Sequence, residues 1–289
     1  MEMKISAYVI VYNNQQYLPS VLQTILDQDI DVLEIIIIDD GSDPPVSSNF
    51  IKYSPKKITL HRNNQNMGRG YSRYKAMKLC KGEFILCVDS TNTIEKQFLS
   101  KLLYHFKDAN VACVYGQLYV PNKKSFINRW KARHLLKQDQ DTGGTTPTDI
   151  LITYGTIIKK RIYDICGGFN PQLTYNEDKD LGVKFTKHGF YMIGDSKAKI
   201  YSLKKETLLS LMERYSRWYM DTDETPCLYS YLHNIKASLN PMFKMDLKEL
   251  DILSGMISLM SPHFQFYFSI LTYIKINLSN CKYTNKKVT

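Results

Sequence analysis

The hydrophobic pattern of the first ninety residues alternates between short strand-like runs and stretches with helical periodicity. Between these strand-like runs, apolar residues recur at helical spacing over 17–26 and 71–80. Uninterrupted apolar runs are typical of strands buried on both faces of a parallel sheet. The alternation predicts an α/β fold with a Rossmann-like, mostly parallel sheet flanked by helices. The predicted strands cover residues 5–11, 33–38, 58–61 and 84–88.

The character of the sequence changes in its last third. Up to about residue 200 further strand-like runs follow, over 111–120 and 150–158, after a predicted helix over 97–106. From about Glu206 onward, apolar residues fall on one helical face and little strand signal remains. We therefore predict an α/β domain over 1–203 and a helical C-terminal region over 204–289.

The apolar and aromatic stretch over 252–278 allows two interpretations. Serine, proline, histidine and lysine interrupt it, so it lacks the run of about 18 apolar residues that a membrane-spanning helix needs. One interpretation is a pair of helices that pack on the main domain. The other is a helix in a membrane interface, which Lys282, Lys286 and Lys287 just beyond it would suit.

Composition limits the class of protein and its surroundings. With 289 residues, 44% hydrophobic and 23% charged, the chain is an ordinary globular protein. The six cysteines form no Cys-x-x-Cys pair, and the N-terminus does not resemble a signal peptide, so we expect reduced thiols in a cytoplasmic protein. A net charge of +10 favours an anionic partner such as a nucleotide phosphate, an anionic membrane face or nucleic acid, without choosing among them.

Acidic residues follow two of the predicted strands. Asp39 and Asp40 end the second strand, and Asp89 ends the fourth. Open α/β sheets bind ligands in the crevice outside the carboxyl ends of their strands, so these residues are candidates for a ligand site. Asp-Gly-Ser after a strand is also a common turn, but a second strand-end acid favours the functional interpretation.

Six short motifs occur in a fixed order between residues 4 and 200. They are Ser-Ala-Tyr-Val-Ile-Val-Tyr-Asn (6–13), Ile-Ile-Asp-Asp-Gly-Ser (37–42), Asn-Met-Gly (66–68) through Arg73 to Lys-Gly-Glu-Phe-Ile (81–85), Val-Asp-Ser-Thr (88–91), Gly-Gly-Phe-Asn (167–170) and Asn-Glu-Asp-Lys-Asp-Leu (176–181). Each motif alone is weak, whereas six in this order and spacing are specific. Their order resembles that of the inverting GT-A glycosyltransferases of family 2, which use nucleotide-diphosphate sugars.

The resemblance implies a donor site. Its base pocket would contain a carboxylate, that of Asp40, that accepts the imide N–H of uracil. Asp89 matches the first acid of the family's D-x-D motif, near the ribose and diphosphate. The implied donor-binding residues are Ile10, Tyr12, Asp39, Asp40, Arg69, Arg73 and Asp89.

The resemblance also implies a catalytic pair, Glu177 and Asp178, in which Asp178 matches the base. Inverting transfer needs a base on the face opposite the leaving diphosphate, where it takes the proton of the acceptor hydroxyl. The following apolar periodicity predicts that the two acids begin a helix. Acids at such positions are also common partners of the helix dipole.

The sequence departs from the family at the metal site. Thr91 stands where the family has a metal-binding acid, which leaves Asp89 as the carboxylate of this motif and puts a Mg²⁺ or Mn²⁺ ion in doubt. Arg217 belongs to a stretch, 214–218, that resembles the Gln-x-x-Arg-Trp motif of processive members with its Gln replaced. Arg217, with Lys204, Lys205 and Arg214, could instead neutralise the leaving diphosphate.

Three hypotheses follow for the function. The first is transfer of a sugar from a uridine-type nucleotide donor to a hydroxyl of a saccharide or lipid-linked saccharide, in the cytoplasm or on the cytoplasmic face of a membrane. The second is transfer to a modified base of DNA, which the basic charge favours and the lack of a nucleic-acid motif disfavours. The third, motivated by Thr91, is a catalytically silent GT-A binding module.

Overall fold

The computed structural model describes residues 3–49, 57–138, 144–148, 150–219 and 226–285. It divides into two compact units: residues 1–119 with 141–204, called unit 1, and residues 120–140 with 205–289, called unit 2. The division after 204 lies next to the predicted boundary at 203. The assignment of residues 120–140 to unit 2 differs from the prediction, which placed them in the α/β domain.

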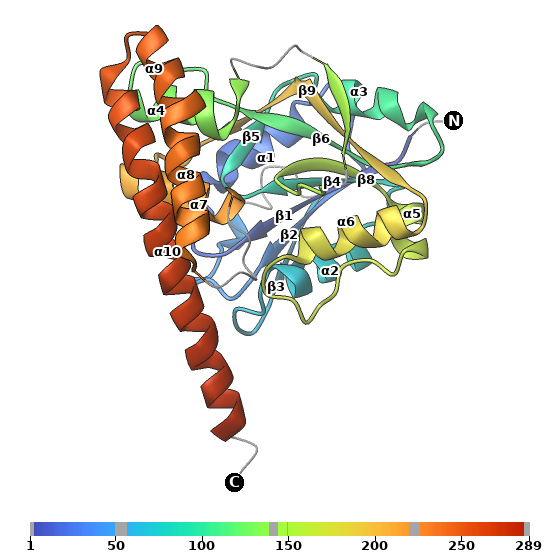
Figure 1. The fold of residues 1–289 in the computed structure, drawn as a ribbon. Coiled ribbons are helices and arrows are strands. Elements are labelled where there is room, and N and C mark those ends of the chain that lie inside the picture. Colours follow the sequence, from blue (N-terminus) through green and yellow to red (C-terminus); the bar gives the residue numbers. More distant parts are fainter. Residues whose placement is uncertain (1–2, 50–56, 139–143, 149, 220–225, 286–289) are drawn as a thin grey trace. The chain divides into compact units, whose positions relative to one another are not determined.

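Unit 1 is built on one twisted sheet of nine strands, drawn in Figure 1. The strand order is β3-β2-β1-β4-β8-β6-β9-β5, and β7 pairs with β9 off this path. The strands are β1 (Ile5–Val11), β2 (Glu34–Asp39), β3 (Ile58–Arg62), β4 (Phe84–Asp89), β5 (Asn92–Ile94), β6 (Val111–Tyr119), β7 (Thr145–Thr148), β8 (Gly155–Lys159) and β9 (Tyr191–Ser202).

The two halves of the sheet differ in strand direction. β3, β2, β1 and β4 are all parallel, as the sequence predicts. β8 runs antiparallel to both β4 and β6, and β6 pairs in parallel with β9. The expectation of a mostly parallel sheet therefore describes the N-terminal half, whereas the other half is mixed. The apolar run over 150–158 forms a strand only from Gly155 onward.

Helices cover both faces of the sheet. Helices α2 (Arg69–Leu79), α5 (Lys160–Ile165) and α6 (Glu177–Lys187) lie together on one face, and α1 (Leu18–Leu26) and α3 (Phe98–Leu103) belong to the other (Figure 1). The core under α2, α5 and α6 joins Ile36 and Ile38 of β2 to Met77 of α2 and Phe185 of α6. This arrangement confirms the α/β fold predicted from the alternating pattern.

Unit 2 is helical. Its helices are α4 (Phe126–Trp130), α7 (Leu208–Tyr219), α8 (Leu228–Ala237), α9 (Lys244–Lys248) and α10 (Ile252–Asn285). The stretch over 252–278, for which one of the two interpretations was a pair of helices, belongs to one helix, α10, which continues through Pro262. No helix in the described part of the chain is long and apolar enough to span a membrane.

A buried polar network explains why residues 120–140 belong to unit 2. The indole Nε1 of Trp130 donates to Oγ of Ser258 at 2.9 Å, and this hydroxyl donates to Asp246 at 2.5 Å. Arg133 and His134 bind the other oxygen of the same carboxylate. All these side chains are buried, so the network satisfies polar groups that would otherwise be costly inside unit 2.

Candidate active site

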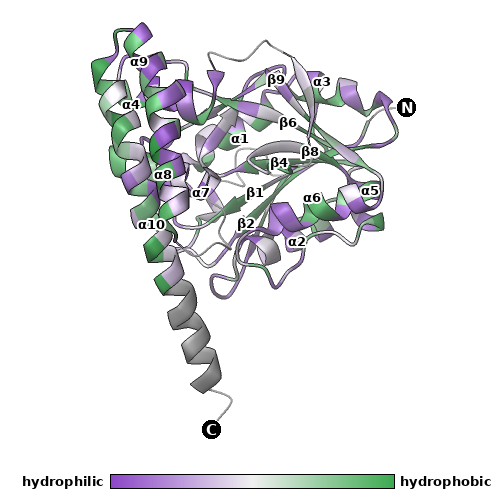
Figure 2. Cartoon of the chain, viewed as in Figure 1, coloured by the Kyte–Doolittle hydropathy of each residue, from purple (hydrophilic) through white to green (hydrophobic). Residues whose placement is uncertain are grey.

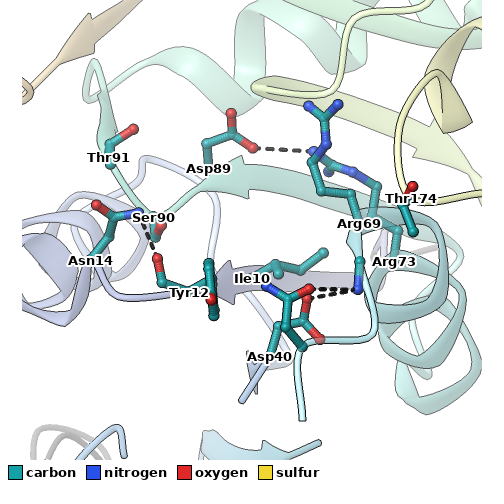
Figure 3. A pocket seen from close by; sticks show the side chains of 12 residues that line it. Ile10, Tyr12, Asn14, Asp40, Arg69, Arg73, Asp89, Ser90, Thr91 and Thr174 are labelled. Atoms are coloured by element: carbon teal, nitrogen blue, oxygen red, sulfur yellow. Dashed lines mark hydrogen bonds and ion pairs between the residues drawn. The ribbon is translucent and has the colours of Figure 1, made fainter. Parts of the chain in front are cut away.

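A cavity of about 370 Å³ lies at the carboxyl ends of β1, β2 and β4 in unit 1. Parallel strands end at the same edge of a sheet, so residues far apart in the sequence converge there. Figure 3 shows Arg69 and Arg73 on one side of the cavity and Asn14 and Thr91 on the opposite side. The lining residues are Ile10, Tyr12, Asn14, Asp40, Asn66, Gly68, Arg69, Arg73, Asp89, Ser90, Thr91 and Thr174.

Asp40 is a buried carboxylate that holds the loop before α2. Its Oδ1 accepts hydrogen bonds from Nδ2 of Asn63 at 2.7 Å and from the backbone N–H of Met67 at 2.9 Å. Its Oδ2 accepts one from the backbone N–H of Gly68 at 3.1 Å. Each carboxylate oxygen has two lone pairs, so Oδ2 can accept a further N–H from a ligand in the cavity.

Asp39 is turned away from this cavity. Successive side chains of a strand point to opposite faces, so Asp39 and Asp40 cannot share a side of the sheet. The carboxylate of Asp39 accepts backbone N–H groups of Ser42 and Val46 and binds Arg62. Burial opposes ionisation of Asp39, but these hydrogen bonds outweigh it and lower the pKa of the carboxyl. The structure therefore places Asp39 as the anchor of the following turn rather than in the lining.

Arg73 is a buried cation between two acids. Its Nε lies 3.2 Å from Oε1 of Glu177, and its Nη2 lies 3.2 Å from Oδ1 of Asp89. Its Nη1 lies 3.4 Å from the hydroxyl of Tyr8. Burial disfavours the charge, but Tyr8, Asp89 and Glu177 raise the pKa of Arg73 well above its ordinary value. Arg73 thus stays charged and links β4, β1 and the start of α6.

Glu177 ties a second arginine to the same place. Its Oε1 also lies 3.5 Å from Nε of Arg69, whose side chain is 53% exposed in the cavity. The side chain of Glu177 is fully buried, and its Oε2 has no hydrogen-bond partner among the described residues. One buried carboxylate therefore fixes two guanidinium groups, of which Arg69 is the one accessible to a ligand.

Asp178 follows Glu177 in the first turn of α6. It is half-buried, and its Oδ1 accepts the backbone N–H of Lys179 at 2.9 Å. Asp178 is not among the residues that line the cavity. The contact of Glu177 with Arg73 fixes the start of α6 beside the lining. The two acids lie in the first turn of this helix, as the sequence predicts, and the role of Asp178 as the base stays a prediction.

Close approach of two backbones shapes this corner of the site. Gly68 has a φ of +86°, and a Cβ at Gly70 would lie 2.2 Å from the carbonyl oxygen of Leu173. Only glycine at these positions lets the start of α2 approach the loop that carries Thr174. This contact brings the Asn-Met-Gly motif and the loop before α6 together.

The side-chain oxygens around Asp89 could hold a metal ion only together with phosphate oxygens of a bound substrate. Asp89 is 42% exposed, and one of its oxygens binds Arg73. The neighbouring side chains in the lining are the hydroxyls of Ser90 and Thr91. No cluster of three or more His, Cys, Asp or Glu within the described ranges could hold a metal ion. Mg²⁺ usually combines one or two carboxylates with substrate phosphates, and Asp89 can supply one.

Three of the four predicted cations, Lys205, Arg214 and Arg217, belong to unit 2, and Lys204 ends unit 1. Arg217 lies in α7, where its side chain is exposed. Arg214 of the same helix lies 2.9 Å from Glu206, which also binds Lys131 at 2.5 Å. The ion pair with buried Glu206 occupies Arg214, and the role of Arg217 toward a donor stays a prediction.

Sequence reasoning missed several lining residues. Ser90 directly follows the end of β4, and Asn14 lies three residues after the end of β1, so their place in the sequence was a usable signal. Asn66 and Gly68 lie in a motif that the sequence analysis named without a site role. Thr174 carried no local signal, because its loop reaches the cavity through tertiary contacts with Gly68 and Gly70.

The sheet order, the helices on both faces and a cavity at the strand ends define a GT-A glycosyltransferase fold. The model of the family described as glycosyl transferase family 2 matches residues 6–167. The chain belongs to this family.

Curated proteins similar to this chain in sequence include two that are named as glycosyltransferases. The chain is 30% identical over 155 residues to the putative glycosyltransferase EpsH of Bacillus subtilis, a match that covers 52% of this chain and 39% of EpsH. It is 28% identical over 205 residues to glycosyltransferase GlyG of Streptococcus pneumoniae, with 65% of each chain covered. The chain thus spans less than two thirds of the length of these curated relatives.

Solved structures share the fold. The mannosyltransferase PcManGT of Pyrobaculum calidifontis, in complex with GDP-Man and Mn²⁺, has a TM-score of 0.59 and 16% identity, covering 97% of this chain and 80% of its own. Residues 1–349 of S. aureus TarS in complex with UDP have a TM-score of 0.51 and 20% identity, covering 74% and 65%. At these identities the likeness shows the fold alone.

Proposed function

We propose that the chain is an inverting glycosyltransferase that moves a sugar from a nucleotide-diphosphate donor to a hydroxyl of a saccharide or lipid-linked saccharide. The observation that carries the proposal is the cavity in unit 1, where an apolar and aromatic wall, a buried carboxylate and an exposed arginine lie together. In a nucleotide-sugar site the apolar and aromatic wall would contact the base, the carboxylate would accept the base N–H, and the arginine would bind the diphosphate. Family membership supports the same reaction class.

The base would lie between Ile10, Tyr12 and Asp40. Tyr12 is 45% exposed, so its ring is available to stack on a base. The free lone pair on Oδ2 of Asp40 favours a base with an N–H at that position, as uracil has. Related folds have been solved with UDP and with GDP-mannose, so the preference for UDP rests on Asp40 in this chain.

The diphosphate would be stabilised by Arg69. Its guanidinium is exposed in the cavity, and Glu177 holds it in place without entering the lining. A fixed cation can stabilise the charge that develops on a leaving diphosphate, as an oriented electrostatic group does in other active sites. A divalent ion that binds with the nucleotide would supply further positive charge, with Asp89 as its protein ligand.

Asp178 would act as the base. The acceptor oxygen attacks the anomeric carbon as the bond from that carbon to the diphosphate oxygen breaks, and Asp178 takes the proton of the attacking hydroxyl. Its position in the first turn of α6, one residue after the carboxylate that fixes Arg69 and Arg73, suits this role.

The test combines donor binding with turnover. A panel of nucleotide sugars is screened by thermal shift, since a ligand at 100 times its Kd adds about 2.7 kcal/mol of stability. Release of free nucleotide from the best donor is then measured for the wild type, Asp178→Asn and Asp180→Asn. Asp180 is the matched control, because it lies on the same helix and pairs with Lys184 at 2.7 Å.

Asp178→Asn should lower turnover by about 10²- to 10⁴-fold with donor affinity retained. Asp180→Asn should leave both nearly unchanged. Wild-type turnover in Asp178→Asn would show that another group takes the proton. If no donor stabilised the protein or was turned over, the chain would be the silent binding module instead.

The acceptor and location form the finer part of the proposal. Homologous enzymes of this family include chondroitin synthase of Escherichia coli and poly-beta-1,6-N-acetyl-D-glucosamine synthase of Staphylococcus aureus. Both names denote synthesis of polysaccharides, which supports a saccharide acceptor and a place in polysaccharide biosynthesis. We propose that the reaction takes place in the cytoplasm, because Cys80, Cys87, Cys113, Cys166 and Cys227 are free thiols and thiols stay reduced in that compartment. The net charge of +10 suits an anionic nucleotide sugar as partner.

A further inference from the structure

Helix α10 of unit 2 has an unusually polar buried side. It carries Ser254, Ser258, Ser261 and Gln265, all 5% exposed or less, beside the apolar Ile257 at 2%. These serines bind inside unit 2, as when the hydroxyl of Ser254 donates to Asp251 at 2.7 Å. Surface helices ordinarily bury their apolar stripe and expose their polar one. An apolar face left outward is therefore expected to contact something other than water.

The exposed side of α10 is an apolar stripe, which we call the outward stripe. Successive members are three to eight residues apart in steps that keep them on one face of a helix. Figure 2 shows apolar colour recurring along the described part of α10. From Ile252 to Ile274 the stripe extends about 33 Å at 1.5 Å per residue. Its members and their exposures are Ile252 69%, Met256 54%, Leu259 36%, Tyr267 54%, Ile270 37% and Ile274 46%.

Neighbouring elements of unit 2 add to this apolar surface. Helix α8 packs on α10 through Tyr231, whose hydroxyl lies 2.8 Å from Nδ1 of His263. The same helix exposes Leu228 at 67% and Tyr229 at 81%, and Leu250 in the turn before α10 is 88% exposed. Single exposed apolar residues are ordinary, but a set that recurs along one face over this length, with His263 between Leu259 and Tyr267, marks a binding surface.

The charge of unit 2 indicates what covers the stripe. Unit 2 contains 16 of the chain's 38 Lys and Arg residues and 9 of its 28 Asp and Glu residues. It therefore holds most of the net charge of +10. The sequence of α10 contains no Asp or Glu over its 34 residues. An apolar stripe in a positively charged unit is complementary to an anionic lipid surface.

We propose that the outward stripe of α10 binds the surface of an anionic membrane, with the helix lying in the plane of the interface. An in-plane helix agrees with the finding that no described helix can span a bilayer. A second copy of the chain is the less suitable occupant, because face-to-face pairing would bring two positively charged units together. The proposal concerns α10 alone and does not depend on the transfer reaction.

The experiment measures co-sedimentation of the full chain with lipid vesicles in the absence of nucleotide. One vesicle is pure phosphatidylcholine and the other contains phosphatidylglycerol. The variant is Met256→Glu/Ile270→Glu, which places two charges on the outward stripe. The matched control is Ile165→Glu, because Ile165 is 54% exposed and lies in α5 of unit 1. Circular dichroism confirms that both variants keep the helical content of the wild type.

We expect the wild type and Ile165→Glu to bind the anionic vesicles, less strongly at high salt because ions screen the lipid charge. The partition of Met256→Glu/Ile270→Glu should fall at least tenfold, because each new carboxylate is repelled by the anionic surface and must leave water. Absence of wild-type binding, or equal binding of the double variant, would overturn the proposal. So would a dimer in sedimentation velocity that the double variant abolishes, since the stripe would then bind a second copy.

Discussion

Replacing Asp40 by asparagine separates recognition of the base from maintenance of the loop. The side chain keeps its shape, but an NH₂ group replaces one acceptor oxygen. If Oδ1 keeps its two donors, the new NH₂ faces the backbone N–H of Gly68, 3.1 Å from the present Oδ2. The unsatisfied N–H should cost about 1–3 kcal/mol of stability. A ligand N–H also loses its charged acceptor, which is worth about 1.5–3 kcal/mol and corresponds to roughly 10- to 150-fold in Kd.

Asn63→Ala provides the control for the loop. Asn63 is buried and outside the cavity lining, and its Nδ2 donates to Asp40 at 2.7 Å and to Ser72 at 2.9 Å. Its loss should destabilise the same loop by a similar amount while leaving the carboxylate in place. The two variants therefore share a structural cost and differ in the acceptor offered to the base.

Calorimetric titration of UDP, CDP and GDP measures the difference. Wild type and Asn63→Ala should prefer UDP, whereas Asp40→Asn should bind UDP about 10- to 150-fold more weakly and lose that preference. Unchanged UDP affinity in Asp40→Asn would refute base recognition by this carboxylate. Equal losses in both variants would show that Asp40 acts only through the loop.

Three further predictions concern the buried charges and the metal. Glu177→Gln should lower the free energy of unfolding by about 2–4 kcal/mol in urea titration. This is less than the full cost of breaking a buried ion pair, because Arg73 retains its ion pair with Asp89. An unchanged unfolding midpoint would contradict this prediction. Metal binding without nucleotide should be undetectable by calorimetry. Arg217→Ala should impair turnover more than excess EDTA does. Complete loss of activity in EDTA, together with unchanged activity of Arg217→Ala, would instead indicate an ordinary metal-dependent site. The Arg129 guanidinium, against the opposing effect of burial, holds the pKa of Asp251 far below its ordinary value, so this stabilisation is present above about pH 4 and declines as pH falls below it. Asp251→Asn should flatten that acid-dependent loss in thermal melts, and an unaltered pH profile would disprove it.

The strands and the strand-end acids could be predicted from the sequence, because both follow from local pattern. β-Branched runs define β1 to β4, and the carboxyl ends of parallel strands meet at one edge whatever the details of packing. The sequence alone therefore predicts that Asp40 and Asp89 lie near each other. The start of α6 at Glu177 was likewise readable from the apolar periodicity that follows it.

The face of the sheet to which each side chain points could not be predicted from the sequence in the same way. A strand buried on both faces gives no contrast between its two sides, so the sequence placed Asp39 and Asp40 together in the site. Packing decides between them: Ile36 and Ile38 join the core under α2, and the alternation then carries Asp40 to that side and Asp39 to the other.

The sequence by itself determined the family, the α/β order and the residues that could carry chemistry, because motifs and periodicity are properties of neighbouring residues. Tertiary structure alone decided the pairing of Arg73 with Glu177, which are 104 residues apart, and the membership of residues 120–140 in unit 2. It also decided which side of α10 is buried. A surface helix ordinarily buries its apolar side. In α10 the network of Trp130, Asp246 and Ser258 instead holds the serine side inward, because buried polar groups must be satisfied.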